Sequence, residues 1–214
     1  MKHNQPILKM YFLRHAHKDK KGNLTKKGEK QVLDYLKTMD APGGIEIYHS
    51  PIQRAVETAN IIRKYSPVPV KTVSKLEELT EEPYSDEMIE KLKINNGKWL
   101  ETHSPSIHLP STKIINERIQ KLIDDFISES SKREEKSDRN IFFITHAPPI
   151  MLHIKHIFEN EFKKDNSKTT VLEKMGGFVE PMKGFELSVV NDNRNTELRY
   201  QYKNFKKTIK LPLS

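Results

Sequence analysis

The sequence has no cysteine, only one tryptophan and no long apolar run. Without cysteine the chain has no disulfides, no thiolate metal ligands and no cysteine nucleophile. A membrane-spanning helix needs about 18–20 consecutive apolar residues, and no segment approaches that length. The first residues, Met1 to Pro6, lack the apolar core of a secretory signal. We therefore expect a cytoplasmic protein without a membrane-spanning segment.

Positive charge is in excess. The chain has 37 lysines and arginines and 29 aspartates and glutamates, which gives a net charge of +8. The lysines are spread along the chain, and no motif that reads nucleic acid accompanies them. A solvated basic surface explains this distribution and favours anionic partners. We expect an anionic ligand and do not expect nucleic acid. The sequence does not indicate an oligomeric state.

Short apolar runs alternate with helical patterns over the 214 residues. This alternation is typical of an α/β sheet covered by helices on both faces. The predicted strands are 7–13, 45–49, 68–73 and 141–145, followed by a hairpin of 185–190 and 197–202. The predicted helices are 25–39, 50–65, 85–95, 114–127 and 149–158. We expect one domain over residues 1–214, with an insertion at about 81–111 over the active site and a charged solvent loop at 128–139.

Two of the buried strands are followed directly by a histidine. Residues 7–13 run into Arg14 and His15, and residues 141–145 run into His146. Ligands of open α/β sheets bind outside the carboxyl ends of the parallel strands. The guanidinium of an arginine can donate hydrogen bonds to two phosphate oxygens at once. A neutral imidazole nitrogen can act as a nucleophile. The alternatives are an exposed loop for Arg14 and His15 and a hydrogen-bonded core residue for His146.

Arg54 is a third candidate. It lies one turn into the helix that Ser50 and Pro51 are predicted to cap and start. Helical side chains lean toward the N-terminus, so Arg54 is expected to point toward His15 and to share the anion-binding potential of the helix start. The alternative is a surface ion pair with Glu57 or Glu29. His153 and His156 are interpreted as surface or packing residues, and no metal site is expected.

Four segments resemble the motifs of a known family. Leu13-Arg14-His15-Ala16 resembles the Arg-His-Gly/Ala signature of the histidine phosphatase superfamily, the phosphoglycerate mutase-like proteins. Residues 24–31, 48–59 and 145–150 are similar to its Leu-Thr-x-x-Gly, Ser-Pro-x-x-Arg-Ala and late histidine segments. The four segments fall in the order of the family and span about residues 7–155. The resemblance implies a three-layer α/β/α sandwich with a mostly parallel mixed sheet.

The resemblance also implies roles for these residues. His15 attacks phosphorus and carries a phosphohistidine, with its other ring nitrogen donating to a backbone carbonyl. Arg14, Arg54 and a protonated His146 surround the phosphate oxygens, where charge is spread in the transition state. No metal or cofactor is implied.

The leaving alcohol needs a proton, which the family takes from a carboxylic acid after the third strand. Leu76-Glu77-Glu78 matches its Leu-x-Glu pattern, so Glu78 is predicted to be the general acid. Glu77, Glu81 and Glu82 remain alternatives.

The predicted activity is that of a metal-independent phosphomonoesterase, a hydrolase that acts on a phosphorylated small molecule or a phosphoprotein. One alternative is a phosphoglycerate mutase-type phosphotransferase. It is disfavoured because the extension that mutases carry after the first motif is absent. A second alternative is a catalytically silent module that binds a phosphorylated ligand or regulates another protein.

Overall fold

The computed structural model describes residues 6–79, 112–132, 139–164, 169–192 and 195–212. The predicted insertion at 81–111 lies outside the described residues, and so do the predicted helix 85–95 and the candidates Glu81 and Glu82.

The described strands form one seven-stranded sheet in the order β3-β2-β4-β1-β5-β6-β7. Strands β1 to β4 are parallel to one another, and β5, β6 and β7 continue the sheet in antiparallel fashion. The bounds are β1 Leu8–Arg14, β2 Ile45–His49, β3 Val70–Lys75, β4 Arg139–Thr145, β5 Gly184–Asp192, β6 Asn195–Tyr202 and β7 Phe205–Pro212. The predicted mostly parallel mixed sheet is confirmed.

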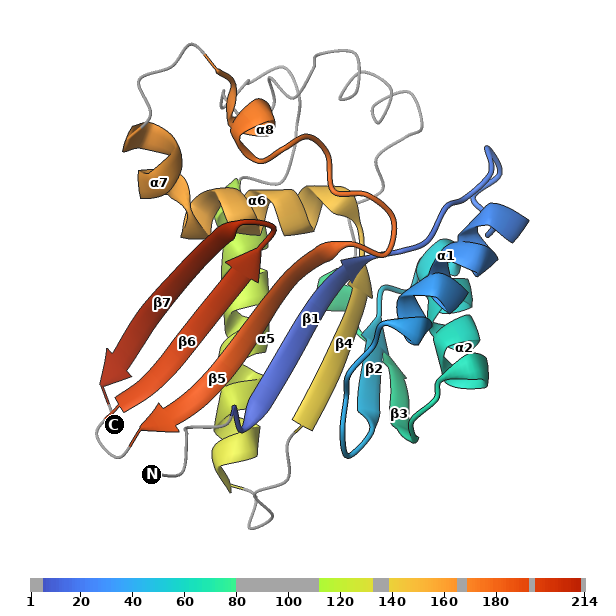
Figure 1. Ribbon diagram of the computed structural model, residues 1–214, viewed down its shortest axis with the longest axis horizontal. Coiled ribbons are helices and arrows are strands. Elements are labelled where there is room, and N and C mark those ends of the chain that lie inside the picture. The colour runs from blue at the N-terminus through green and yellow to red at the C-terminus, as the bar shows by residue number, and fades with distance from the viewer. Residues whose placement is uncertain (1–5, 80–111, 133–138, 165–168, 193–194, 213–214) are drawn as a thin grey trace.

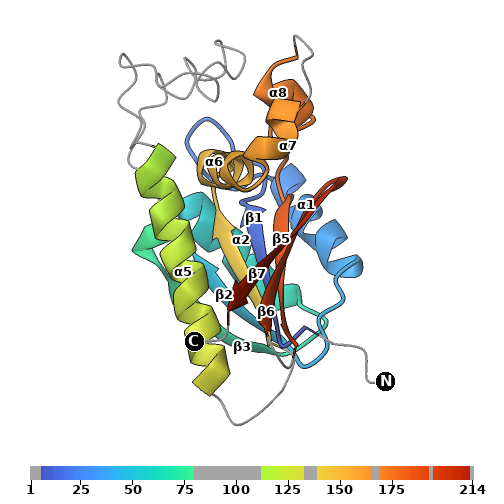
Figure 2. The same cartoon turned by 90° about the vertical axis from the view of Figure 1, so that its left-hand side faces the viewer.

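Helices cover both faces of this sheet. Their bounds are α1 Lys26–Lys37, α2 Gln53–Tyr65, α5 Thr112–Lys132, α6 Ala147–Ile157, α7 Glu159–Lys164 and α8 Val171–Lys174, and Glu77–Leu79 is a 3₁₀ turn, η1. Helices α1 and α2 pack together on one side, and α5 and α6 on the other (Figures 1 and 2). The three-layer arrangement is therefore confirmed. None of the described helices is long and apolar enough to cross a membrane.

Strand β4 is buried on both faces, which explains its continuous apolar run. Phe143 and Ile141 pack toward α5 and α6, while Phe142 and Ile144 pack toward α1 and α2. All seven of its residues are buried. Such strands occur where helices cover both faces of a parallel sheet. Because β4 lies between β2 and β1, the residue that follows it, His146, lies at the carboxyl end of the parallel strands.

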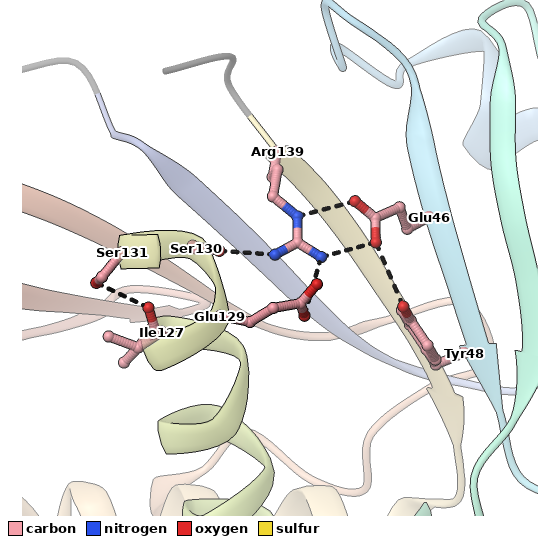
Figure 3. Close-up of polar contacts among 7 residues, drawn as sticks. All are labelled: Glu46, Tyr48, Ile127, Glu129, Ser130, Ser131 and Arg139. Carbon is pink, nitrogen blue, oxygen red and sulfur yellow. Dashed lines mark hydrogen bonds and ion pairs between the residues drawn. The ribbon is translucent and has the colours of Figure 1, made fainter. Parts of the chain in front are cut away.

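The predicted loop 128–139 is wrong at both ends. Helix α5 continues to Lys132, and Arg139 begins β4 as a buried residue. The guanidinium of Arg139 binds both carboxylate oxygens of Glu46 at 2.8 Å (Figure 3). It also contacts Glu129 and Ser130 near the end of α5. A charged residue was interpreted as solvent-exposed because its buried partner lies 93 positions away in the sequence.

The chain after α6 also differs from the prediction. Residues 205–212 form a further strand, β7, which was not predicted, and α7 and α8 were not predicted either. Strand β7 packs Phe205, Ile209 and Leu211 against the core, and the exposed residues Lys206, Thr208 and Lys210 alternate with the partly buried ones. Alternation of this kind indicates a strand with one solvated face. The density of lysine in this segment hid that signal.

The start of α2 is a third correction. The helix begins at Gln53, and Ile52 is its N-cap residue, without a side-chain capping bond. Ser50 was predicted to cap this helix, but it lies before the capping position. Its hydroxyl oxygen lies instead 2.9 Å from Nε2 of His146.

Candidate active site

The two strand-end histidines lie side by side at one edge of the sheet. Strands β1 and β4 are parallel neighbours, and Arg14 pairs with Thr145 at their carboxyl ends. The backbone amide of His15 donates to the carbonyl of Thr145 at 2.9 Å, and the ring centroids of His15 and His146 are 5.2 Å apart. Residues more than 130 positions apart therefore form one site, as the sequence pattern predicted.

Arg54 bridges the two histidines. Its Nε donates to Nε2 of His15 at 2.9 Å, and its Nη2 lies 3.1 Å from Nδ1 of His146. The side chain therefore points toward the carboxyl end of β1, as predicted. The carboxylate of Glu57, the alternative partner, accepts from the backbone amide of Leu24 and from the side chain of Gln53.

The arginine determines which nitrogen of His15 carries a proton. A guanidinium only donates hydrogen bonds, so Nε2 of His15 must accept through its lone pair. The proton of the neutral ring is then on Nδ1, which donates to the carbonyl of Ala16 at 2.7 Å. The nitrogen that carries a lone pair therefore faces Arg54. This is the backbone hydrogen bond that the resemblance implied for His15.

The same argument applies to His146. Its Nδ1 faces the donor Nη2 of Arg54, so its ring proton is on Nε2, which donates to the hydroxyl oxygen of Ser50 at 2.9 Å. Both Ser50 and His146 are buried. Without a bound anion, each of the two histidines is a neutral ring with one fixed tautomer.

The surroundings favour these neutral rings. Burial is the main reason that the pKa of His15 is lowered to about 3. The hydrogen bond to the carbonyl of Ala16 raises this pKa, and the positive charges of Arg54, Arg14 and Lys18 lower it further. Burial, followed by the charge of Arg54, lowers the pKa of His146 well below its usual range. An anion among these groups would reverse the electrostatic part of both shifts.

Arg14 is held from its own side of the site. Its Nη1 donates to the carbonyl of Val179 at 2.7 Å, and its backbone bonds to Lys183 and Met182 at 2.9 Å each. The segment before β5 thus braces the arginine. Its charge lowers the pKa of both His15 and His146, so it belongs to the same electrostatic environment.

The predicted general acid lies on the turn next to β4. The hydroxyl of Thr145 donates to the carbonyl of Leu79 at 2.7 Å, which fastens η1 beside the residue that precedes His146. Glu78 is an exposed residue of this turn. Glu77, its neighbour, forms an ion pair with Lys75 at 2.8 Å. Both glutamates are exposed, so the assignment of Glu78 as general acid stays a prediction.

Two hydroxyl groups of the site were not predicted as functional residues. Ser50 was interpreted as a helix cap. The Oγ1 atom of Thr58 on α2 accepts from the amide of Ala16 at 3.1 Å and donates to the carbonyl of Arg54 at 2.7 Å. Thr58 therefore fastens the loop after β1 to the helix that carries Arg54. The sequence did offer one indication of this role, because residues four apart on a helix, such as Arg54 and Thr58, lie on the same face.

The fold and these side chains define an α/β protein with two histidines and two arginines gathered at the carboxyl edge of a mixed sheet. The chain belongs to the histidine phosphatase superfamily (branch 1), whose family model matches residues 10–174. Members of this superfamily are phosphatases or mutases that act on phosphorylated substrates. The family that the sequence motifs resemble is thus confirmed. No curated protein matches the sequence.

Solved structures share the fold over nearly the whole chain. A protein described as mycobacterial hydrolase 2 is 14% identical, with a TM-score of 0.62 and coverage of 92% of this chain and 89% of that one. The mycobacterial glucosyl-3-phosphoglycerate phosphatase is 14% identical, with a TM-score of 0.59 and coverage of 95% and 97%. The phosphoglycerate mutase of Bacillus anthracis is 18% identical, with a TM-score of 0.56 and coverage of 97% and 94%. The predicted phosphoglycerate mutase-like fold is confirmed.

Proposed function

We propose that this protein is a metal-independent phosphomonoesterase that hydrolyses a phosphorylated substrate through a phosphohistidine on His15. The observation that carries the proposal is the bridge of Arg54 between Nε2 of His15 and Nδ1 of His146. It supplies a neutral ring nitrogen, with its lone pair oriented, next to a guanidinium that can transfer its hydrogen bonds to phosphate oxygens.

The first step forms the covalent intermediate. Arg54 moves its donors from the histidine rings to the phosphoryl oxygens, which frees the lone pair of His15 Nε2. That lone pair attacks phosphorus in line, and the bond from phosphorus to the ester oxygen breaks. Glu78 gives its proton to the leaving oxygen, so the products of this step are the alcohol and phosphohistidine.

The second step returns the protein to its starting state. Water attacks the phosphorus, the bond to His15 Nε2 breaks, and the Glu78 carboxylate takes a proton from the water. Inorganic phosphate leaves and the neutral ring is restored. Arg14, Arg54 and His146 surround the phosphoryl oxygens in both steps, and the dianion raises the pKa of His146 so that Nδ1 gains a proton and donates.

Hydrolysis of 4-nitrophenyl phosphate in the presence of EDTA tests this proposal. We expect turnover by the wild-type protein and a loss of at least about 10³-fold in kcat for His15→Ala. The matched control is His156→Ala, because His156 is an exposed histidine of α6. This control should keep the wild-type rate.

The intermediate is tested by quenching a reaction with a phosphate-labelled substrate. We expect a protein adduct that is stable in base and labile in acid, and that is absent from His15→Ala. A wild-type protein that hydrolyses no phosphomonoester would exclude the phosphatase activity. Release of phosphate to a second acceptor instead of water would point to a phosphotransferase. A panel of phosphorylated small molecules and phosphopeptides then identifies the substrate class.

A further inference from the structure

Ser50 is a buried serine at the junction of β2 and α2 that caps no helix. The side chain is fully buried, and its hydroxyl oxygen lies 2.9 Å from Nε2 of His146. Its backbone is fixed on both sides, because its amide donates to Ile144 at 2.9 Å and its carbonyl accepts from Nδ1 of His49 at 2.9 Å. The hydroxyl is thus held beside Nε2 of His146, whereas Arg54 contacts the other ring nitrogen, Nδ1.

We propose that Ser50 is a positioning residue whose hydroxyl oxygen accepts a hydrogen bond from the Nε2–H of His146 and keeps Nδ1 turned to the phosphate. This inference rests on the proposed function, because it assigns the tautomer of a ring that the proposed reaction uses. The hydroxyl oxygen has two lone pairs. One faces His146, and the other accepts from the amide of Ile52 at 3.4 Å.

The tautomer matters because the two sides of His146 are chemically different. Arg54 presents a donor to Nδ1, so a proton on Nδ1 would oppose that donor while no anion is bound. A proton on Nε2 avoids this conflict, but the resulting N–H is buried and needs a hydrogen-bond acceptor, because a buried donor without one destabilises the protein. Ser50 is that acceptor. It therefore makes the tautomer with a lone pair on Nδ1 the stable one.

The same contact remains useful after phosphate binds. Nδ1 then gains a proton, and the ring becomes a cation with two donors. The charged and titratable groups that act on this ring are Arg54 on α2, Arg14 and His15 at the end of β1, and Lys18 in the following loop. Three of these groups are cations, so they oppose protonation of the ring. An oxygen acceptor at Nε2 offsets part of that opposition.

The variant Ser50→Ala removes the acceptor with a small change in volume. Long-range ¹H–¹⁵N spectra of the unliganded protein report which ring nitrogens carry protons, and loss of signals in His146→Gln and His15→Gln assigns the two rings. We expect the ring proton of His146 to be shared between Nε2 and Nδ1 in Ser50→Ala, instead of being fixed on Nε2. The His15 tautomer should stay unchanged, because the contacts of that ring with Arg54 and Ala16 remain.

Binding and turnover give the second measurement. We expect Ser50→Ala to weaken inorganic phosphate binding and to lower kcat/KM by about tenfold, the usual consequence of an unpaired buried donor. The alkaline limb of the kcat profile should move to lower pH, because the protonated His146 in the complex has lost an acceptor. Ser50→Thr keeps the hydroxyl and should restore the wild-type tautomer.

The matched control is Ser66→Ala at the other end of α2. The hydroxyl of Ser66 also contacts the backbone, at Val68, but it lies far from the histidines along the helix. It should leave tautomers, phosphate affinity and pH profile unchanged. Wild-type spectra of His146 in Ser50→Ala, or altered spectra with wild-type phosphate affinity, would overturn the role of Ser50. If the wild-type protein hydrolyses no phosphomonoester, the proposed function fails, whereas ring protons and phosphate affinity still decide this inference.

Discussion

At the scale of single residues, Arg54 has the most demanding position in the site. Its guanidinium reaches two histidines through two different nitrogens, Nε and Nη2. A planar fork makes this possible, because its donors diverge at fixed angles from one rigid group. A lysine ammonium at the same place is a point charge on a flexible stem. It cannot hold both rings and then grip two phosphate oxygens.

The variant Arg54→Lys tests this requirement. It keeps the charge and loses the fork, so we expect a fall in kcat/KM of about 10²–10³-fold in hydrolysis of 4-nitrophenyl phosphate. The matched control is Arg63→Lys, because Arg63 is exposed in the last turn of the same helix. An Arg54→Lys variant with wild-type kinetics would show that charge alone is sufficient there.

Glu78 and Glu77 form a second residue-scale comparison. If Glu78 protonates the leaving oxygen, Glu78→Gln should slow an alkyl phosphate by about 10²-fold or more. It should slow 4-nitrophenyl phosphate much less, because that leaving group needs little protonation. Glu77→Gln breaks only the exposed ion pair with Lys75 and should change both substrates little. Equal losses for both substrates in Glu78→Gln would rule out its role as general acid.

At the scale of elements, the buried ion pair joins β2, β4 and α5 at the end of the sheet opposite the histidines. Arg139 and Glu46 are 4% and 8% exposed, whereas Glu129, which also contacts Arg139, is 46% exposed (Figure 3). Removal of one partner of a buried ion pair strongly lowers the free energy of unfolding, because the charge of the other partner stays buried without compensation. An exposed ion pair contributes little because solvent screens it.

Arg139→Met should therefore lower the free energy of unfolding by about 3–5 kcal/mol, because it removes the guanidinium that offsets the charge of the buried Glu46 carboxylate. Glu129→Gln should cost less than about 1 kcal/mol. Urea unfolding of each variant measures both effects. The fraction that remains folded should keep the activity proposed for the site, since Arg139 begins β4 and His146 follows its other end. Similar losses for the two variants would contradict the importance of burial.

At the scale of the whole molecule, buried neutral histidines make stability depend on pH. His153 on α6 is 1% exposed and stacks on Phe185, and both of its ring nitrogens lack a hydrogen-bond partner among the described residues. Burial lowers its pKa to about 3, with a smaller effect from the charge of His156. The interpretation of His153 as a packing residue is thus confirmed, and His156 is exposed.

The sign of the pH dependence follows from that lowered pKa. Below its ordinary value of about 6.5, the unfolded chain binds a proton that the folded protein does not, so stability falls as pH decreases toward 3. At pH 5 this single histidine is expected to cost about 2 kcal/mol. His153→Phe keeps a ring against Phe185 and should show a smaller loss between pH 7.5 and pH 5 in urea unfolding. His156→Gln should keep the wild-type dependence, and an equal slope in His153→Phe would refute the assignment.

Much of the fold and of the candidate site was predictable because its signals are local. The apolar runs before His15 and His146 specify buried strands, and a parallel sheet brings the carboxyl ends of such strands to one edge. Arg54 is the second residue of α2, because the helix begins at Gln53 and not at the predicted Ser50, and the lean of helical side chains toward the N-terminus still gives the direction in which Arg54 points. The roles of these residues, the general acid, the single domain and the cytoplasmic location stay predictions.

The sequence by itself determined where the central strands lie in the chain, the class of fold and the residues that meet at the site, since periodicity and motif order carry that information. Only the tertiary structure decided which partner each polar group has. The hydroxyl oxygen of Ser50 lies 2.9 Å from Nε2 of His146 instead of capping a helix, and Arg139 is buried against Glu46 instead of lying in a solvent loop. A hydrogen bond depends on a distance of about 3 Å and a direction between atoms far apart in the chain. No local pattern of residues encodes that geometry.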